Sequence, residues 1–122
     1  MKLAVVGSRD FDDYEWMERC LLSVVAAEEL EAVISGGARG ADALGARFAS
    51  VHGIPLIVVP AEWKKFGRGA GPMRNAEIVR LADVIAAFWD GSSRGTRDTL
   101  ERARRADRRV IVFPCRPRKD ED

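Results

Sequence analysis

The stretch "ISGGARGADALG", residues 34–45, links an apolar run to a helical pattern through a turn that contains three glycines and one arginine. The apolar run ends at Ile34, and Ala41, Leu44 and Phe48 then recur at the spacing of one helix face. Glycine inside an element costs about 0.5–1 kcal/mol relative to alanine, so a glycine cluster indicates a tight turn or a close approach by another group. Strand, glycine turn and helix in this order make up one unit of an α/β fold.

Five short runs rich in valine and isoleucine predict five strands. The runs have little of the alternation between apolar and polar residues that marks a half-exposed strand. This pattern is typical of strands that are buried on both faces of a parallel sheet. The runs cover residues 3–6, 32–34, 54–59, 84–89 and 110–113.

The segments between these runs have helical spacing. Asp12 and Glu15 form a capping-box-like start for the first helix. Gly53 is a plausible stop for the second helix, and Pro72 suits the first turn of the third. The alternation predicts a three-layer α/β domain, in which a five-stranded parallel sheet carries helices on both faces.

The composition indicates a single domain and limits its partners. With 122 residues and 47% hydrophobic content, the chain can bury one ordinary core, which we expect over residues 1–114. Residues 115–122 are expected to be a charged, disordered tail. The 20 basic and 19 acidic residues give a net charge of +1, which disfavours a surface for duplex nucleic acid or anionic lipid.

The sequence also predicts where the chain resides and what it lacks. No segment is long and apolar enough for a signal peptide or a membrane span, so we expect a soluble, cytoplasmic protein. Cys20 and Cys115 have no metal-site spacing and are expected to be free thiols. We expect no cofactor and no metal ion.

Glycine and arginine gather in the segments that follow the first four runs. The arginines there are Arg9, Arg39, Arg68, Arg74 and Arg94. In a parallel sheet these segments all emerge at the carboxyl edge, where open α/β sheets bind their ligands. Glycine lets backbone N–H groups approach a ligand, and the planar fork of arginine matches phosphate. The pattern therefore predicts an anion pocket, although such turns often need glycine in any case.

The individual motifs leave alternatives open. "GGARGAD" has neither the ending of a Walker A loop nor the spacing of the dinucleotide fingerprint. Asp42 either interacts with the helix dipole or accepts a hydrogen bond from a ribose hydroxyl. Ser92, Ser93 and Thr96 either cap a helix or bind phosphate oxygens. Residues 60–75 form either a binding loop or a solvated loop.

The strength of single contacts favours a ligand larger than phosphate. Charge-assisted hydrogen bonds contribute about 1.5–3 kcal/mol each, and two or three of average strength fall short of the roughly 8 kcal/mol of micromolar binding. The aromatic-containing segment 60–75 offers a place for a base, which indicates a nucleotide-derived ligand. His52, the single histidine, lies at the far end of its helix. Any acid–base chemistry would fall to Asp42, Glu62, Glu77, Asp90 or Asp98.

Four motifs follow the first four runs: "GSRDF", "SGGARGAD", "PAEWKKFGRGAGPMRN" and "AFWDGSSRGT". Over residues 1 to about 114 this ordered set resembles the YspA-like branch of the SLOG superfamily. That superfamily includes the DNA-processing protein DprA, the LOG phosphoribohydrolases and several nucleotide-sensing domains. The resemblance implies a Rossmann-like sheet of strand order 3-2-1-4-5 with a nucleotide-derived ligand at its carboxyl edge. SLOG relatives are often dimers, which leaves a homodimer open.

The resemblance and the glycine–arginine pattern indicate the same binding residues. The leading hypothesis is a sensor or sequestering module that binds a nucleoside phosphate, ADP-ribose or an NAD-like molecule. The residues expected to bind it are Gly7, Ser8, Arg9, Gly36, Gly37, Arg39, Gly40, Asp42, Arg74, Asn75, Asp90, Gly91, Ser92, Arg94, Gly95 and Thr96.

The resemblance implies two alternative functions. LOG enzymes, which are nucleotide N-glycosidases, pair an arginine with a glutamate that lies three residues after the threonine of a "GGxGT" loop. Arg74 matches that arginine and Gly95 with Thr96 match the loop, but Asn75 replaces the neighbouring lysine and Thr99 stands in the place of the glutamate. DprA-like binding of single-stranded DNA is the other alternative, for which the arginines from 97 to 109 are the candidates.

Overall fold

The computed structural model describes residues 1–116 and contains one sheet of five parallel strands in the order β3-β2-β1-β4-β5. This order confirms the predicted Rossmann-like α/β fold. Of the expected tail, residues 117–122 lie outside the described part of the chain. The strands are β1 (Lys2–Gly7), β2 (Ala32–Ser35), β3 (Leu56–Val58), β4 (Val84–Phe88) and β5 (Arg109–Phe113).

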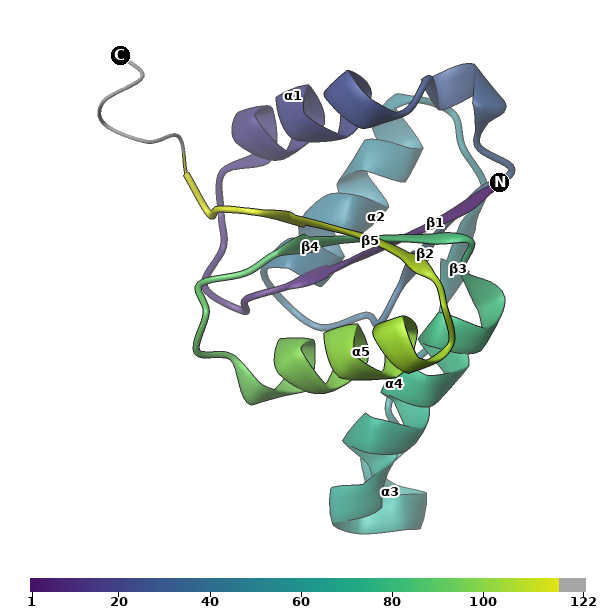
Figure 1. The fold of residues 1–122 in the computed structure, drawn as a ribbon, viewed down its shortest axis with the longest axis vertical. Coiled ribbons are helices and arrows are strands. Elements are labelled where there is room, and N and C mark those ends of the chain that lie inside the picture. The colour runs from purple at the N-terminus through teal and green to yellow at the C-terminus, as the bar shows by residue number, and fades with distance from the viewer. Residues whose placement is uncertain (117–122) are drawn as a thin grey trace.

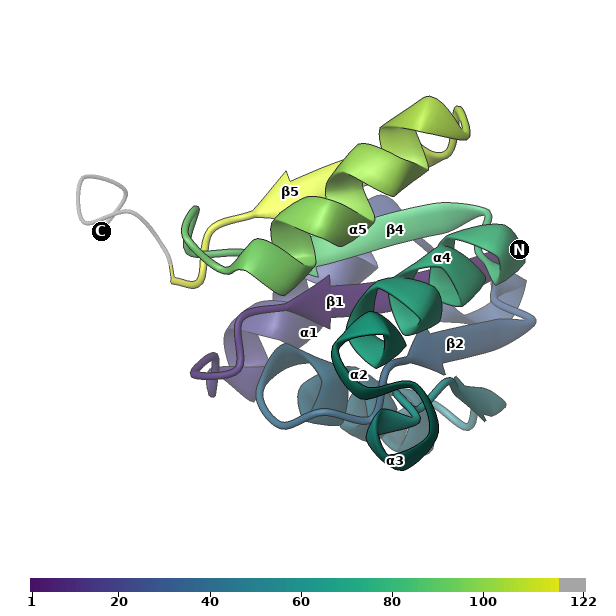
Figure 2. The same ribbon diagram turned by 90° about the horizontal axis from the view of Figure 1, so that it is seen from below.

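Helices cover both faces of the sheet, as the alternation of runs predicts (Figure 1). Helices α1 and α2 lie on one face, and α4 and α5 lie side by side on the other (Figure 2). The short helix α3 extends away from the sheet below α4 (Figure 1). The helices are α1 (Tyr14–Val24), η1 (Ala27–Glu29), α2 (Ala41–Val51), α3 (Trp63–Phe66), η2 (Gly67–Gly69), α4 (Ala70–Leu81) and α5 (Arg94–Arg105).

Two apolar layers hold the helices to the sheet. Met17 and Phe48 are fully buried in the layer beneath α1 and α2, and Ile78 and Leu100 are buried in the layer beneath α4 and α5. Burying a large apolar side chain of this kind contributes roughly 1.5–3 kcal/mol, so each helix is held mainly by its apolar stripe. Within residues 1–116 no helix is long and apolar enough to cross a membrane.

The prediction that all five strands are buried on both faces is wrong for the two outer strands. The central strands β1, β2 and β4 are buried along nearly their whole length. In β3, by contrast, Leu56 is 40% exposed and Val58 is 50% exposed, and Val112 in β5 is 44% exposed. An edge strand has a neighbour on one side only, and the helices are centred over the inner strands. Run composition alone does not distinguish an edge strand from a central one.

Two local boundaries also differ from the sequence prediction. The N-cap of α1 is Asp13 rather than Asp12, because the Asp13 carboxylate accepts the N–H of Trp16 at 3.0 Å. Residues 60–75 are not a plain loop, since they contain α3, η2 and the start of α4. Gly53 follows α2 with φ of +65°, which fits the expected stop.

Candidate functional site

A cavity of about 180 Å³ lies at the carboxyl edge of the sheet, next to the end of β1 and the first turns of α2, α4 and α5. The register places Gly7 beside Phe88, so β1 and β4 end at the same level. The first turns of α2 and α5, where N–H groups have no partner within the helix, therefore lie at this edge. The lining residues are Val6, Gly7, Arg9, Ala38, Asp42, Arg74, Asn75, Ile78, Ser93, Gly95, Thr96 and Thr99.

Arg74 is fixed at the cavity by two hydrogen bonds. Its Nη1 donates to the backbone oxygen of Gly36 at 2.8 Å, and its Nε donates to Oδ1 of Asn75 at 3.1 Å. A Cβ at position 36 would lie 2.6 Å from that Nη1 and 2.7 Å from Oδ2 of Asp42. A side chain at position 36 would therefore displace the ends of Arg74 and Asp42 from these positions.

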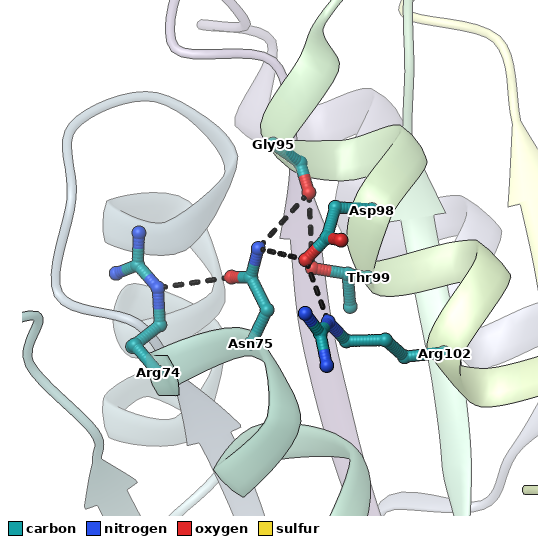
Figure 3. A network of polar contacts seen from close by, with 6 residues as sticks. All are labelled: Arg74, Asn75, Gly95, Asp98, Thr99 and Arg102. Atoms are coloured by element: carbon teal, nitrogen blue, oxygen red, sulfur yellow. Dashed lines mark hydrogen bonds and ion pairs between the residues drawn. The ribbon is translucent and has the colours of Figure 1, made fainter. Parts of the chain in front are cut away.

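Asn75 joins α4 to α5 and positions Arg74 (Figure 3). Its Nδ2 donates to the backbone oxygen of Gly95 at 3.3 Å and to Oδ2 of Asp98 at 3.0 Å. The same Asp98 oxygen accepts the Nε–H of Arg102 at 2.8 Å. Burial acts to raise the pKa of Asp98, but the hydrogen bonds from Arg102 and Asn75 outweigh it and lower that pKa. Asp98 therefore remains an ionised acceptor that orients the amide of Asn75.

Asp42 is the one carboxylate that lines the cavity among residues 1–116. Its Oδ2 accepts the N–H of Ala38 at 3.2 Å. Burial raises the pKa of Asp42, while that hydrogen bond and the positive charges of Arg74 and Arg9 partly offset the rise. The carboxylate therefore serves as a hydrogen-bond acceptor at one end of a cavity whose other polar groups are mostly donors.

Asp90 organises the turn after β4 rather than the cavity wall. Its Oδ1 accepts the backbone N–H groups of Ser92 and Ser93 at 2.8 and 3.0 Å. These hydrogen bonds lower the pKa of Asp90. The Oγ of Ser8 accepts the N–H of Asp90 at 3.1 Å, which ties the turn to the end of β1. Ser8 and Asp90 thus hold the turn after β4 to the end of β1, and neither of them lines the cavity.

Comparison with known proteins gives the family. Residues 1–66 match the YspA, cpYpsA-related SLOG family. The chain belongs to this SLOG family. It is also 36% identical over 128 residues to the Gene 61 protein of Mycobacterium phage D29, in an alignment that covers 95% of this chain and 98% of the phage protein.

Two solved structures share the fold of this SLOG domain. DNA processing protein A (DprA) from Streptococcus pneumoniae superposes with a TM-score of 0.76 at 23% identity over 93% of this chain. The single-stranded DNA-binding DprA from Helicobacter pylori superposes with a TM-score of 0.73 at 19% identity over 98% of this chain. The SLOG domain spans 50% of the S. pneumoniae protein and 67% of the H. pylori protein. At these identities the likeness establishes the fold alone.

The remaining predicted residues of the SLOG domain lie around the cavity rather than in its wall. Arg39 extends into solvent with 77% of its side chain exposed, and its Nη2 lies 3.9 Å from a carboxylate oxygen of Asp10. Gly91, Ser92 and Arg94 are exposed and do not line the cavity.

Gly36 and Gly37 line a second hollow of about 160 Å³, together with Pro60, Ala61 and Trp63. This hollow adjoins the cavity, because Arg9, Ala38 and Arg74 line both.

Ser93 and Thr99 also line the cavity. Ser93 is one of the residues for which the sequence left open a helix cap or a phosphate contact, whereas Thr99 was not among the predicted binding residues. Thr99 follows Thr96 by three residues, so both lie on the face of α5 that points to the cavity. That spacing was available from the sequence. The hydroxyl of Thr99 donates to the backbone oxygen of Gly95 at 3.1 Å.

His52 and the cysteines do not line the cavity. His52 is the C-cap of α2, where its Nε2 lies 2.9 Å from Oε2 of Glu18. Cys20 and Cys115 are free thiols. Among residues 1–116, no three or more His, Cys, Asp and Glu side chains come together where they could hold a metal ion.

Proposed function

We propose that this SLOG domain binds a nucleotide-derived small molecule across the two adjoining hollows. The observation that carries the proposal is that Arg9 and Arg74 line both of them. Each hollow is smaller than the roughly 300–1,000 Å³ of a typical small-molecule site, whereas the two together come within that range. A ligand with two chemically distinct parts fits this arrangement.

The phosphate belongs in the cavity. Arg74 is the arginine best placed for it, because Nε and Nη1 are occupied by Asn75 and Gly36 while Nη2 has no hydrogen-bond partner within residues 1–116. The first turn of α5 contributes the hydroxyl of Thr96 and the unpaired backbone N–H groups of a helix N-terminus, which favour anions. A phosphate in the cavity would thus accept hydrogen bonds from both the Arg74 guanidinium and the backbone N–H groups of α5.

The base belongs in the second hollow, against Trp63. Trp63 is 52% exposed, and its indole ring lies against Gly71, where a Cβ would approach the ring within 3.2 Å. Pro60 and Ala61 give the rest of this wall an apolar character. We assign the sugar to Asp42, which lines the cavity and lies next to Gly36 of the second hollow, so that its carboxylate would accept a hydrogen bond from a sugar hydroxyl. We infer that the protein works as a sensor or sequestering module.

Calorimetric titration with nucleoside monophosphates and diphosphates, ADP-ribose, NAD and inorganic pyrophosphate tests this proposal. Base–aromatic stacking contributes about 1–3 kcal/mol per base, so Trp63→Ala should weaken nucleotide binding roughly 5- to 150-fold and leave pyrophosphate binding unchanged. Phe66→Ala is the matched control, because Phe66 is also an exposed aromatic residue of α3 but does not line the hollow. Wild-type protein that binds none of these compounds would contradict the proposal.

Chromatography of the same mixtures separates binding from hydrolysis. A LOG-type reaction needs a carboxylate at the scissile bond, whereas the cavity presents Thr99 at the corresponding position. Asp98 is held by Asn75 and Arg102 outside the lining. We therefore expect the nucleotides to be recovered intact. Free base in the mixture would instead establish the hydrolase alternative, with Asp42 as its first candidate acid.

Binding of a single-stranded nucleic acid is the second candidate function, because the charges are segregated in the fold. Residues 63–109 contain 12 basic and 6 acidic side chains, whereas residues 1–62 contain 5 basic and 10 acidic ones. Residues 63–109 supply α3, α4 and α5, which lie on one side of the sheet (Figure 1). The face of the domain that carries α3, α4 and α5 is therefore basic, although the net charge of the whole chain is only +1. The single-stranded DNA-binding DprA shares this fold.

Gel-shift titration of a thymidine oligonucleotide over a range of salt concentrations tests this second function. The logarithm of the affinity should fall with the logarithm of salt concentration by about 0.7 for each phosphate neutralised. Replacing Lys64 and Lys65 by alanine should reduce that slope, whereas Arg47→Ala on the opposite face should not change it. No shift at low salt would exclude this function.

A further inference from the structure

A second group of arginines surrounds a groove between α4 and α5, apart from the candidate cavity. The groove is shallow and open to solvent, has a volume of about 430 Å³, and is lined by Arg80, Arg102, Arg105 and Arg108. Small apolar residues such as Val79 form its floor. The two helices lie side by side on one face of the sheet (Figure 2). This groove shares none of the lining residues of the cavity at the carboxyl edge.

Within residues 1–116, only two of these four arginines form an ion pair with a carboxylate. Arg80 pairs with Glu77, and Arg102 pairs with Asp98. Arg108 donates instead to backbone oxygens of α4, to Val79 at 3.2 Å and to Arg80 at 3.4 Å. These oxygens satisfy hydrogen bonds but carry no full charge. An excess of positive charge therefore remains at the groove.

Arg105 and Arg102 have donors left for a ligand. Within residues 1–116, the Arg105 side chain makes no hydrogen bond or ion pair, and it is exposed beside the groove. Arg102 uses only its Nε for Asp98, and its two terminal nitrogens take part in none of the hydrogen bonds drawn in Figure 3. Several guanidinium groups that converge without matching carboxylates repel one another, and a bound anion removes that repulsion.

We propose that this groove is a second anion site, which takes two or more linked phosphate groups. A guanidinium binds phosphate through two parallel hydrogen bonds, and linked phosphates present several negative charges to the four arginines. The volume lies within the range of small-molecule sites. The linked phosphates come either from a free polyphosphate or from the backbone of a single strand of nucleic acid. The site does not depend on the proposed function of the cavity.

Calorimetric titration with inorganic tripolyphosphate tests whether the groove binds linked phosphates independently of the cavity. Arg105→Glu should remove groove binding, and Arg105→Ala should weaken it at least about tenfold, because each lost charge-assisted bond has that order of effect. Arg104→Glu is the matched control, because it makes the same charge change at a neighbouring exposed position of α5. Arg104 does not line the groove. Equal losses in the Arg105→Glu and Arg104→Glu variants would overturn the proposal, because they would show general charge attraction.

The Arg74→Ala variant separates this proposal from the proposed function of the cavity. If both sites bind tripolyphosphate, Arg74→Ala and Arg105→Glu each remove one site, and the double variant removes both. If only Arg105→Glu has an effect, the groove proposal stands and the cavity proposal fails for this probe. If only Arg74→Ala has an effect, the groove proposal is overturned. Circular dichroism of each variant verifies that the fold is retained.

Competition identifies the source of the phosphates. In the Arg74→Ala variant, a short thymidine oligonucleotide that displaces tripolyphosphate identifies the nucleic-acid backbone as the natural ligand. Failure of the oligonucleotide to displace it identifies a free polyphosphate. A glutamate-rich peptide that displaces tripolyphosphate equally well would overturn the phosphate assignment and indicate an acidic protein partner.

Discussion

Gly40→Ala is expected to destabilise the protein by about 2–6 kcal/mol and to lower its Tm by roughly 10 °C or more. Gly40 precedes α2 with φ of +76°, a conformation that a residue with a side chain adopts at a cost of about 1–3 kcal/mol. An added Cβ would also lie 2.4 Å from the backbone oxygens of Ser8 and Arg9. Those oxygens belong to the turn after β1, so the clash forces apart the two turns that meet at the cavity.

Substitutions at two other glycines distinguish the stability cost of the positive φ from the cost of the steric clash. Gly53 has φ of +65° and nothing within 4 Å of an added Cβ, so Gly53→Ala should cost only about 1–2 kcal/mol. Gly69 has neither a positive φ nor a close neighbour, and Gly69→Ala should change stability by less than about 1 kcal/mol. Urea unfolding of the three variants measures the differences. A Gly40→Ala protein as stable as the Gly53→Ala protein would show that the turns after β1 and β2 do not pack as described.

The general position of the candidate cavity could be predicted from the sequence, because it follows from topology. Parallel strands all end at one edge, so segments rich in glycine and arginine after four strands had to come together there. The runs of valine and isoleucine located the strands, and the resemblance to SLOG proteins supplied their order. None of these steps required the direction of a single side chain.

The choice among the arginines could not be predicted, because it depends on loop torsions and on packing between distant segments. Arg39 lies between two glycines with positive φ, Gly37 and Gly40, and this backbone path carries its side chain outward. Arg74 is 38 residues further along the chain from Gly36, to whose backbone oxygen it donates. Sequence spacing does not show such a contact. The same holds for the link from Asn75 to Asp98, which joins two different helices.

The net charge of the whole chain does not describe the local charge of each face, for a related reason. Counting the whole chain gave +1, which argued against a polyanionic partner. The fold sorts the helices onto two faces, and the acidic residues of the first half lie mostly with α1, η1 and α2. Because charges separated by more than a Debye length, about 8–10 Å, are largely screened from each other, a ligand responds to the local face rather than to the total.

Arg74→Ala is expected to weaken binding of any phosphate-bearing ligand in the candidate cavity by about 10- to 150-fold. The guanidinium supplies charge-assisted hydrogen bonds of about 1.5–3 kcal/mol each, and it is already oriented by Asn75 and Gly36, so little side-chain freedom is lost on binding. Arg74→Lys should recover only part of the affinity, because an ammonium group cannot hold Gly36, Asn75 and phosphate with one rigid fork.

Arg39→Ala provides the decisive contrast, because the sequence pattern assigned both arginines to the ligand and the geometry separates them. The Arg39 side chain is largely exposed and lines neither hollow, so its loss should change the affinity less than about threefold, through long-range attraction alone. That small effect should disappear at high salt, whereas the Arg74 effect should persist, since a partly buried contact is screened much less. Titration of both variants at two salt concentrations measures this difference. If Arg39→Ala abolishes binding while Arg74→Ala does not, the ligand sits on the outside of the turn after β2, and the cavity is not the binding site.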